Sequence, residues 1–151
     1  MKLKSPLASV LLAASLALSL TACGGGGDDG GSNVVVANPA AFTKTDTVVG
    51  TGAEATTGKT ATVTYTGWLY SDTAADHKGT RFDGGTLSYA VGSPNYIKGF
   101  DQGVTGMKVG GKRTVLIPSN LGYGSTGSSQ GTVRIPPNAG LVFDLELTAV
   151  K

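Results

Sequence analysis

The chain has 151 residues, 24 of them glycine, and a formal net charge of +2. Its length suits one domain once a short N-terminal leader is set aside, and the glycine content favours turns and short strands over long helices. Two of the twelve basic residues lie in the leader, so the remainder is charge-balanced with ten acidic residues. This balance argues against a nucleic-acid partner, which needs a basic face, and the single cysteine excludes an internal disulfide.

The N-terminus has the pattern of a secretory signal peptide. Lys2 and Lys4 precede an apolar run from Leu7 to Leu20, which is too short to span a bilayer well. Leu20-Thr21-Ala22-Cys23 resembles the bacterial lipobox, in which the cysteine is diacylated and becomes the mature N-terminus. We therefore expect a lipoprotein signal peptide over residues 1–22 and lipidation of Cys23. The alternative is an ordinary secreted protein whose cysteine is incidental.

Residues 23–41 are expected to form the acylated cysteine and a flexible tether, because Gly24 to Ser32 offers almost no side chains to bury. The residue after the cysteine is glycine and not acidic. By resemblance to sorted lipoproteins, this implies a bacterial cell-envelope protein anchored in the outer membrane, with its domain in the periplasm or on the cell surface. The domain itself is expected over residues 42–151.

The first half of this domain reads as strand and turn. Thr43 to Val49 is β-branched and predicts an edge strand, and Thr60 to Tyr70 is the strongest strand pattern, with Tyr65 on one face and Trp68 on the other. Residues 71–80 are polar and predict a loop. Its Asp72, Asp76 and His77 could be proposed as metal ligands, but a solvated loop is the better interpretation, and no metal is expected.

A strand pair is predicted next, with Arg81 to Asp83 separated from Leu87 to Val91 by a turn or bulge at Gly84-Gly85. Pro94 to Met107 then has the one-sided apolar spacing of a helix on a sheet. Its three glycines would each cost about 1 kcal/mol in an isolated helix, so packing must hold it, and they indicate a backbone lying close to a neighbour. The aromatic residues of its first turn could be core or the floor of an apolar pocket.

The C-terminal part predicts two more strands around a long connection. Arg113 to Ile117 is a strand stopped by Pro118, Asn120 to Pro137 is irregular, and Leu141 to Val150 alternates apolar and polar residues. Strands before and after one helix, without βαβ alternation, predict an antiparallel α+β domain.

The sequence has no pattern of a covalent or metal-dependent active site. The one histidine lies in the polar loop and the one cysteine in the leader, so neither a nucleophile–base pair nor a ligand cluster is visible, and no cofactor is expected. What stands out is a set of aromatic and apolar residues on separate elements with one carboxylate beside them. Such a set favours a ligand pocket over a hydrolytic site.

Seven motifs in order resemble the FKBP-type peptidyl-prolyl cis-trans isomerases, from about Val49 to Val150. They are Val63-Thr64-Tyr65-Thr66-Gly67, Arg81-Phe82-Asp83, Tyr96-Ile97-Lys98-Gly99-Phe100, Gly106-Met107-Lys108-Val109-Gly110, Leu121-Gly122-Tyr123-Gly124, Ile135-Pro136-Pro137 and Leu141-Val142-Phe143-Asp144-Leu145-Glu146-Leu147. The resemblance implies a five- or six-stranded antiparallel sheet curled around one short helix.

The resemblance also implies the residues of the active cleft. Those expected to be catalytic are Tyr65, Phe82, Asp83, Tyr123 and Phe143. Those expected to bind substrate are Leu87, Tyr89, Tyr96, Ile97, Phe100 and Ile135. Each has a structural alternative: the phenylalanines could be plain core, the tyrosine hydroxyls could be structural, and Asp83 could be a turn residue.

The chain departs from the family pattern at four of the positions around this cleft. Phe100 stands where tryptophan is usual, Tyr96 where valine is common, Leu87 where an aromatic residue is more frequent, and Arg134 where an apolar residue is common. We expect these differences to affect substrate preference more than the existence of the pocket.

The expected function is acceleration of Xaa-Pro rotation during folding of cell-envelope proteins, without a covalent step. The resemblance implies proline-containing polypeptide clients and binding of macrolide inhibitors. Family chaperones usually carry a dimerisation segment before the domain, whereas a glycine-rich tether stands there in this chain, so a monomer is expected. The alternative is a non-catalytic module or folding chaperone that binds proline-containing segments. A purely structural lipoprotein would leave the pocket residues without a purpose.

Overall fold

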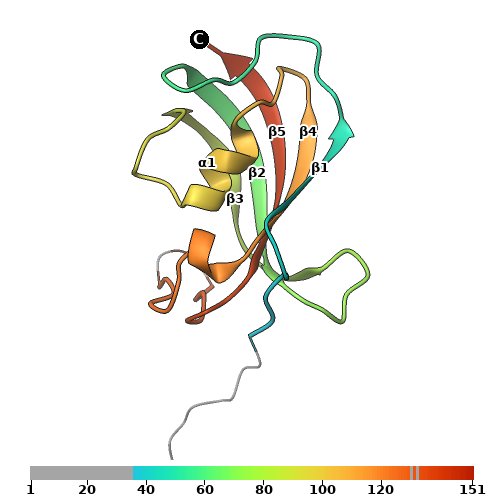
Figure 1. The fold of residues 1–151 in the computed structure, drawn as a ribbon, viewed down its shortest axis with the longest axis vertical. Coiled ribbons are helices and arrows are strands. Elements are labelled where there is room, and N and C mark those ends of the chain that lie inside the picture. Colours follow the sequence, from blue (N-terminus) through green and yellow to red (C-terminus); the bar gives the residue numbers. More distant parts are fainter. Residues whose placement is uncertain (1–35, 130, 132) are drawn as a thin grey trace, which may run out of the picture. The chain divides into compact units, whose positions relative to one another are not determined.

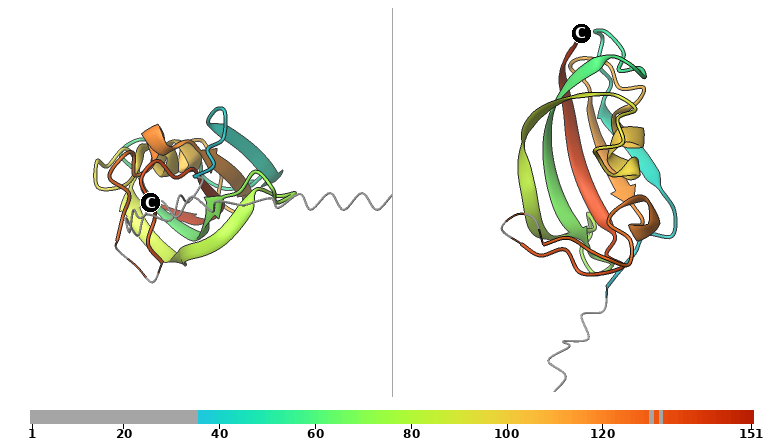
Figure 2. Two further views of the ribbon diagram at one scale, coloured as in Figure 1. Left: turned by 90° about the horizontal axis from the view of Figure 1, so that it is seen from below. Right: turned by 90° about the vertical axis from the view of Figure 1, so that its left-hand side faces the viewer.

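The computed structural model describes residues 36–129, 131 and 133–151. The predicted leader, Cys23 and residues 24–35 of the predicted tether lie outside this range. The elements are β1 (Thr43–Val48), β2 (Thr60–Tyr70), β3 (Lys78–Ala90), α1 (Lys98–Val104), β4 (Lys112–Ile117), a 3-10 helix (Ser119–Leu121) and β5 (Leu141–Val150). The five strands form one antiparallel sheet in the order β1-β4-β5-β2-β3, which curls around α1 (Figures 1 and 2). The α+β prediction is confirmed.

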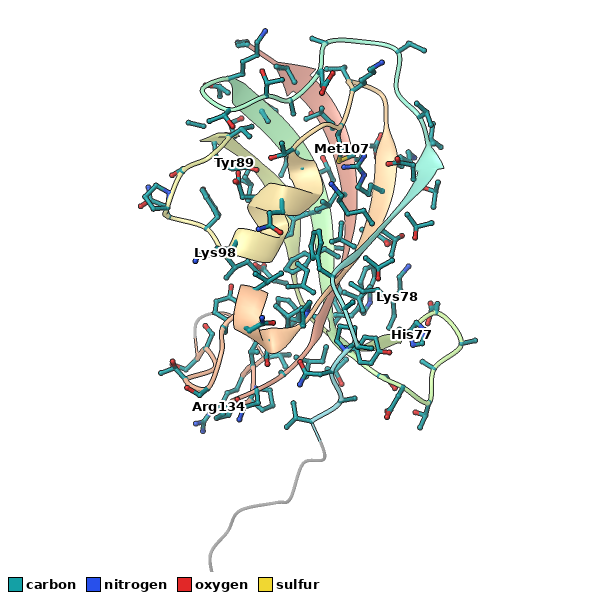
Figure 3. All side chains as sticks on the ribbon, viewed as in Figure 1. His77, Lys78, Tyr89, Lys98, Met107 and Arg134 are labelled. Carbon is teal, nitrogen blue, oxygen red and sulfur yellow. The ribbon has the colours of Figure 1, made fainter. Side chains whose placement is uncertain are left out.

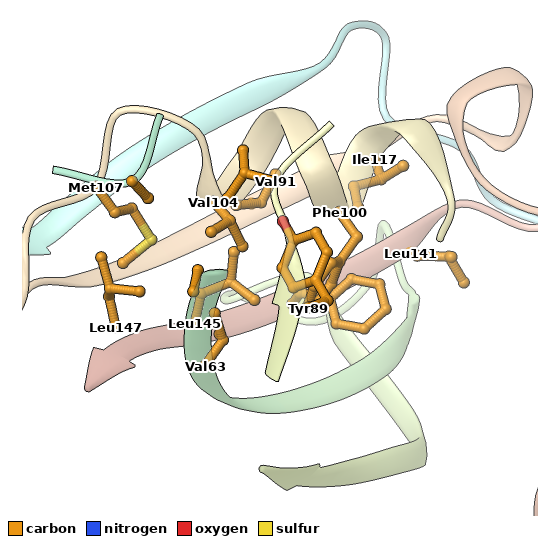
Figure 4. Close-up of a cluster of buried hydrophobic side chains, with 14 of the residues drawn as sticks. Val63, Tyr89, Val91, Phe100, Val104, Met107, Ile117, Leu141, Leu145 and Leu147 are labelled. Carbon is orange, nitrogen blue, oxygen red and sulfur yellow. The ribbon is translucent and has the colours of Figure 1, made fainter. Parts of the chain in front are cut away.

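The core lies between the concave face of the sheet and α1. Alternation along β2 and β5 turns Val63, Leu145 and Leu147 inward, where at most 2% of each side chain is exposed. Val104 of α1 and Met107 of the following turn pack against these three residues (Figure 4). Trp68 lies on the opposite face of β2, as predicted, where the Lys78 ammonium is 4.6 Å from its ring centroid.

The third strand corrects the prediction of two short strands separated by a turn or bulge at Gly84-Gly85. Gly84 and Gly85 lie within one continuous strand, where they pair in regular register with Thr66 and Tyr65. The irregularity comes earlier, because Gly67 pairs with Asp83 while its neighbour Trp68 pairs with Arg81. Phe82 is therefore the extra residue of a β-bulge. Polar and glycine composition suggested a turn, but pairing with β2 keeps the chain extended.

The helix is shorter than the predicted span of residues 94–107. It begins after Ile97, which is its N-cap and makes no side-chain capping bond, and it ends at Val104. Residues 94–96 form the preceding turn, and Gly106 has a φ of +84°, which terminates the helical path. Seven residues cannot sustain an isolated helix, so α1 depends on its tertiary contacts.

One such contact is made by Arg113 of β4, whose side chain is buried. Its guanidinium donates to the carbonyl oxygens of Gly103 (2.8 Å) and Thr105 (3.3 Å), and its Nε lies 2.6 Å from Asp46 Oδ1 in β1. A cation at a helix C-terminus satisfies free carbonyls and interacts favourably with the helix dipole. Arg113 thus joins α1, β4 and β1.

The helix also lies very close to the sheet, as its glycines predicted. A Cβ atom at Gly99 would lie 2.3 Å from Ile117 Cγ2, so only glycine allows this separation. Ile117 itself is fully buried (Figure 4). The close approach places the next residue, Phe100, deep in the concave face of the sheet.

Residues 36–41, which the sequence assigns to the tether, pack against the domain. Val36 contacts the core, Pro39 is buried, and the Gly140 amide donates to the Ala37 carbonyl oxygen at 3.1 Å. No helix within the described residues is long and apolar enough to cross a membrane.

The predicted polar loop ends three residues early, because β3 begins at Lys78. The His77 ring stacks on Tyr70 with centroids 5.0 Å apart, and Figure 3 shows His77 beside Lys78 on the side of the domain away from Lys98. Over the described residues, no three His, Cys, Asp or Glu side chains lie close enough to hold a metal ion.

We predict that Gly99→Ala destabilises the domain. The added methyl group gains about 1 kcal/mol of helix propensity but overpacks against Ile117, and overpacking commonly costs about 1–3 kcal/mol. Because the contact would be as short as 2.3 Å, we expect a net loss in the free energy of unfolding, measured by denaturant titration. Gln102→Ala, on the exposed side of the same helix, should change it by less than about 0.5 kcal/mol. A Gly99→Ala variant more stable than the wild type would contradict the close approach.

Candidate functional site

A cavity of about 250 Å³ opens on the concave face, between the start of α1, strands β2, β3 and β5, and the loop after β4. Nine of the eleven residues predicted for the cleft line it, and one further residue, Asn95, joins them. The lining residues are Tyr65, Phe82, Asp83, Leu87, Asn95, Tyr96, Ile97, Phe100, Tyr123 and Phe143. Side chains from five separate parts of the chain therefore meet in one pocket.

Phe100 forms the floor of this cavity and is only 4% exposed. Its ring centroid lies 5.7 Å from that of Tyr65 and 5.5 Å from that of Phe143, both in edge-to-face geometry. Phe82 meets Phe143 in the same way at 5.6 Å. Edge-to-face pairs are favourable beyond the area they bury, so the rings hold one another in place. Gly67 makes room for them, because a Cβ there would lie 2.7 Å from the Phe82 ring.

The β3 bulge brings two neighbouring side chains to the same cavity. In a regular strand Phe82 and Asp83 would point to opposite faces, but the bulge lets both line the pocket. The Tyr65 hydroxyl donates to Asp83 Oδ2 at 3.0 Å, and the Gly84 amide donates to Oδ1 at 2.8 Å. Asp83 is thus a strand residue fixed by two hydrogen bonds, and the interpretation as a turn residue is wrong.

Two hydrogen-bond donors at the cavity have no acceptor among the described residues. One is the backbone amide of Ile97, which precedes α1 and so has no partner within the helix. The other is the Tyr123 hydroxyl. Burial, followed by the charge of Asp83, raises the pKa of Tyr123, so this hydroxyl keeps its proton at neutral pH. The cavity combines apolar walls with two free donors at its edge.

Two predicted substrate-binding residues do not line the cavity. Tyr89 is 5% exposed, and its ring packs against those of Tyr96 and Phe100 with centroid distances of 4.8 and 5.8 Å. Figure 4 shows it beside Phe100 in the buried cluster. Its hydroxyl donates to Asp101 Oδ1 at 3.1 Å. Ile135 is 2% exposed and belongs to the core. In this structure neither side chain lines the cavity, and Tyr89 packs against two rings that do.

The other positions at which the sequence departs from the family pattern lie partly outside the pocket and partly at its rim. Arg134 is exposed at the outer side of its loop and does not line the cavity (Figure 3). Leu87 and Tyr96 do line it, at the rim. Asn95 was missed because an asparagine in a polar turn carries no sequence signal that separates a pocket residue from an ordinary turn residue.

We predict that Tyr65 ionises unusually late. Burial, assisted by the hydrogen bond and charge of Asp83, raises its pKa from 10.0 to about 12. The unfolded chain therefore loses this proton first, so the stability due to the neutral hydroxyl is complete below pH 10 and declines as the pH rises toward about 12. Phenolate absorbance should contain a component near pH 12 that is lost in Tyr65→Phe and shifts downward in Asp83→Asn, while the still later ionisation of Tyr89, whose pKa burial and the neighbouring Asp101 raise further, remains. Ionisation of Tyr65 near pH 10 in the folded protein would contradict this reading.

Comparisons with known proteins agree with this geometry. Residues 52–148 match the family described as FKBP-type peptidyl-prolyl cis-trans isomerase. An FK506-binding protein of Neisseria meningitidis serogroup A is 48% identical over 101 residues, which cover 67% of this chain and 88% of the relative.

Solved structures give the same result. A peptidyl-prolyl cis-trans isomerase from Pseudomonas syringae pv. tomato has a TM-score of 0.60 and 28% identity, covering 73% of this chain and 75% of its own. AtFKBP13 has a TM-score of 0.60 and 34% identity, covering 76% of this chain and 96% of its own. The matched sequence and the shared fold show that this chain belongs to the FKBP-type peptidyl-prolyl cis-trans isomerases, enzymes that catalyse rotation about the peptide bond before proline.

Proposed function

We propose that the cavity over Phe100 receives the proline ring of a polypeptide substrate and accelerates rotation of the preceding peptide bond. The observation that carries this proposal is an aromatic pocket with two donors at its edge that find no acceptor in the described part of the chain. Rotation of a peptide bond faces a barrier of about 18–20 kcal/mol, because resonance gives the bond partial double-bond character. Both isomers at Xaa-Pro are close in energy but exchange slowly, so lowering the barrier is what a folding catalyst must do.

The apolar lining favours the twisted amide over the planar one. A planar amide has separated charge and is well hydrated, whereas the twisted amide has lost that resonance and needs less hydration. Phe82, Phe100 and Phe143 supply the apolar walls around the ring. Moving the bond from water into such a pocket therefore costs less for the twisted state than for the planar ground state.

The polar groups orient the substrate. The Ile97 amide and the Tyr123 hydroxyl are the free donors, and substrate carbonyl oxygens are the acceptors that suit them. Asp83, held by Tyr65 and Gly84, places a fixed carboxylate beside the twisted bond. Each group binds or orients the substrate, and the proposed reaction has no covalent intermediate.

The rim supports a preference for an apolar residue before the proline, because Leu87, Tyr96 and Ile97 line the opening. Relatives named FK506-binding proteins also support macrolide binding at the same pocket. With Tyr96 and Phe100 in place of the common family residues, we expect the order of preference among substrates to differ from that of relatives that keep valine and tryptophan.

The sequence also supports a place in the bacterial cell envelope. The signal-peptide pattern and the Leu20-Thr21-Ala22-Cys23 motif favour a lipid anchor at Cys23, with outer-membrane attachment through the glycine-rich tether. Clients would then be proline-containing proteins folding in the periplasm or at the cell surface. A monomeric state completes the proposal, since all six residues of the edge strand β1 are exposed and two of them are charged.

The main test uses substitutions of Phe100 in a chain that begins at Gly24. Phe100→Trp should keep isomerase activity toward proline tetrapeptides, because relatives use tryptophan there, and its fluorescence should change on peptide binding. Phe100→Ala should lose most activity and about 3–5 kcal/mol of stability through the emptied aromatic site.

Two controls separate the pocket from general damage. Leu147→Ala empties the core without touching the cavity, so at temperatures where it is folded it should remain active despite losing about 2–5 kcal/mol. The native Trp68, on the outer face of the sheet, should respond weakly to peptide. A folded wild-type chain that binds peptide without accelerating rotation would make the domain a binding module. An active Phe100→Ala variant would refute the pocket assignment.

The anchor is tested by Cys23→Ser. Without the thiol no lipid can be attached, so the variant should move to the soluble fraction or remain unprocessed, as measured by fractionation and intact mass. Membrane-bound Cys23→Ser protein of the mature mass would contradict the lipid anchor.

A further inference from the structure

The segment before β1 contacts both ends of the loop that carries Tyr123. Asn38 Oδ1 accepts a hydrogen bond from the Ser119 amide at 2.8 Å, at the start of the loop. Its Nδ2 donates to the carbonyl oxygen of Asn138, at the loop's end. One side-chain amide therefore joins residues 19 positions apart, and it lies before the range 52–148 that matches the family.

Inside the loop, these two clamped residues are bonded to the same glycine. The Gly124 amide donates to the Ser119 carbonyl oxygen at 2.8 Å, and the Asn138 amide donates to the Gly124 carbonyl oxygen at 2.8 Å. Together with Asn38 they form a closed ring of four hydrogen bonds that passes through Ser119, Gly124 and Asn138. Gly124 directly follows Tyr123, so the ring fixes the backbone next to the free hydroxyl at the cavity.

Two residues of the ring have a left-handed backbone, and the segment that carries Asn38 is held against the end of the loop. Asn138 has a φ of +61° and Gly124 a φ of +58°, and the left-handed region is uncommon for residues other than glycine, asparagine and aspartate. Asn38 is itself held in place, because its neighbour Pro39 is buried and Ala37 accepts a bond from Gly140. A Cβ at Gly140 would lie 2.5 Å from Pro39 Cδ, so this segment and the end of the loop are in close contact.

We propose that Asn38 is a positioning residue of the isomerase site, which acts through the loop of residues 119–138 to hold the Tyr123 hydroxyl at the cavity. The proposal rests on the proposed role of Tyr123 as a donor to the substrate. It also gives residues 36–41 a function beyond that of a tether.

The test is a double-mutant cycle in the full-length chain, with Asn38→Ala and Tyr123→Phe made singly and together. A net hydrogen bond contributes about 0.5–1.5 kcal/mol, so we expect Asn38→Ala to lower kcat/KM about two- to twelvefold in the wild-type background. In the Tyr123→Phe background the same substitution should have almost no effect on kcat/KM, because the hydroxyl it positions is gone. Its effect on the free energy of unfolding should be equal in both backgrounds.

Two further variants test the cycle: one removes part of the Asn38 contacts, and the other is a control elsewhere in the same region. Asn38→Asp keeps the acceptor for Ser119 but loses the donor to Asn138, so it should fall between wild type and Asn38→Ala. Thr43→Ala removes a hydroxyl that, within residues 36–129, 131 and 133–151, bonds only to the nearby Ala41 carbonyl oxygen, and should leave kcat/KM unchanged.

The outcomes are decisive in each direction. If Asn38→Ala lowers kcat/KM equally in both backgrounds, or in neither, Asn38 is merely structural and the proposal is overturned. The same cycle is also measured as affinity for a proline tetrapeptide. An inactive wild-type chain would refute isomerisation, while coupling between Asn38 and Tyr123 in affinity would still support the positioning role of Asn38. In an active chain the coupling in kcat/KM decides the matter, and in an inactive chain absence of coupling in affinity would refute the proposal.

Discussion

The contact between Gly99 of α1 and Ile117 of β4 sets the geometry on which the site depends. Because no side chain separates the helix backbone from the sheet there, the helix lies deep in the concave face and the next residue, Phe100, becomes the cavity floor. A seven-residue helix is not stable alone, so the packing of its glycine and the bonds from Arg113 to its C-terminal carbonyl groups hold it. The contacts that pack α1 into the core therefore also form the floor of the pocket.

Much of the fold could be predicted where local pattern and tertiary demand agree. Strands β2 and β5 have the predicted limits, because both lie in the middle of the sheet and bury one face, which makes their alternation strong. Edge strand β3 could not be predicted correctly, since Gly84 and Gly85 have low strand propensity and only their pairing with β2 extends them. The C-terminal limit of α1 could not be predicted either, because it is set by Gly106 and by contacts distant in sequence.

The sequence predicted which residues gather at the site better than it predicted how deeply each of them is buried. The order of motifs identified which residues gather near Phe100, but neither alternation nor resemblance could show that the Tyr96 ring covers Tyr89, or that Ile135 is enclosed by the core. Both outcomes depend on how neighbouring side chains pack in three dimensions. The contacts of Asn38 could not be predicted at all, because the sequence of residues 36–41 has no pattern that indicates packing against a loop some 80 residues later.

The bulge at Phe82 also changes the free edge of the sheet. β3 is an edge strand, and a long regular edge offers an evenly spaced row of backbone donors and acceptors to any extended polypeptide. The extra residue breaks that spacing and increases the local twist, close to the opening where a client would enter. The residue that forms part of the pocket wall thus also makes the β3 edge a poorer template for β-sheet augmentation than a regular edge of the same length would be.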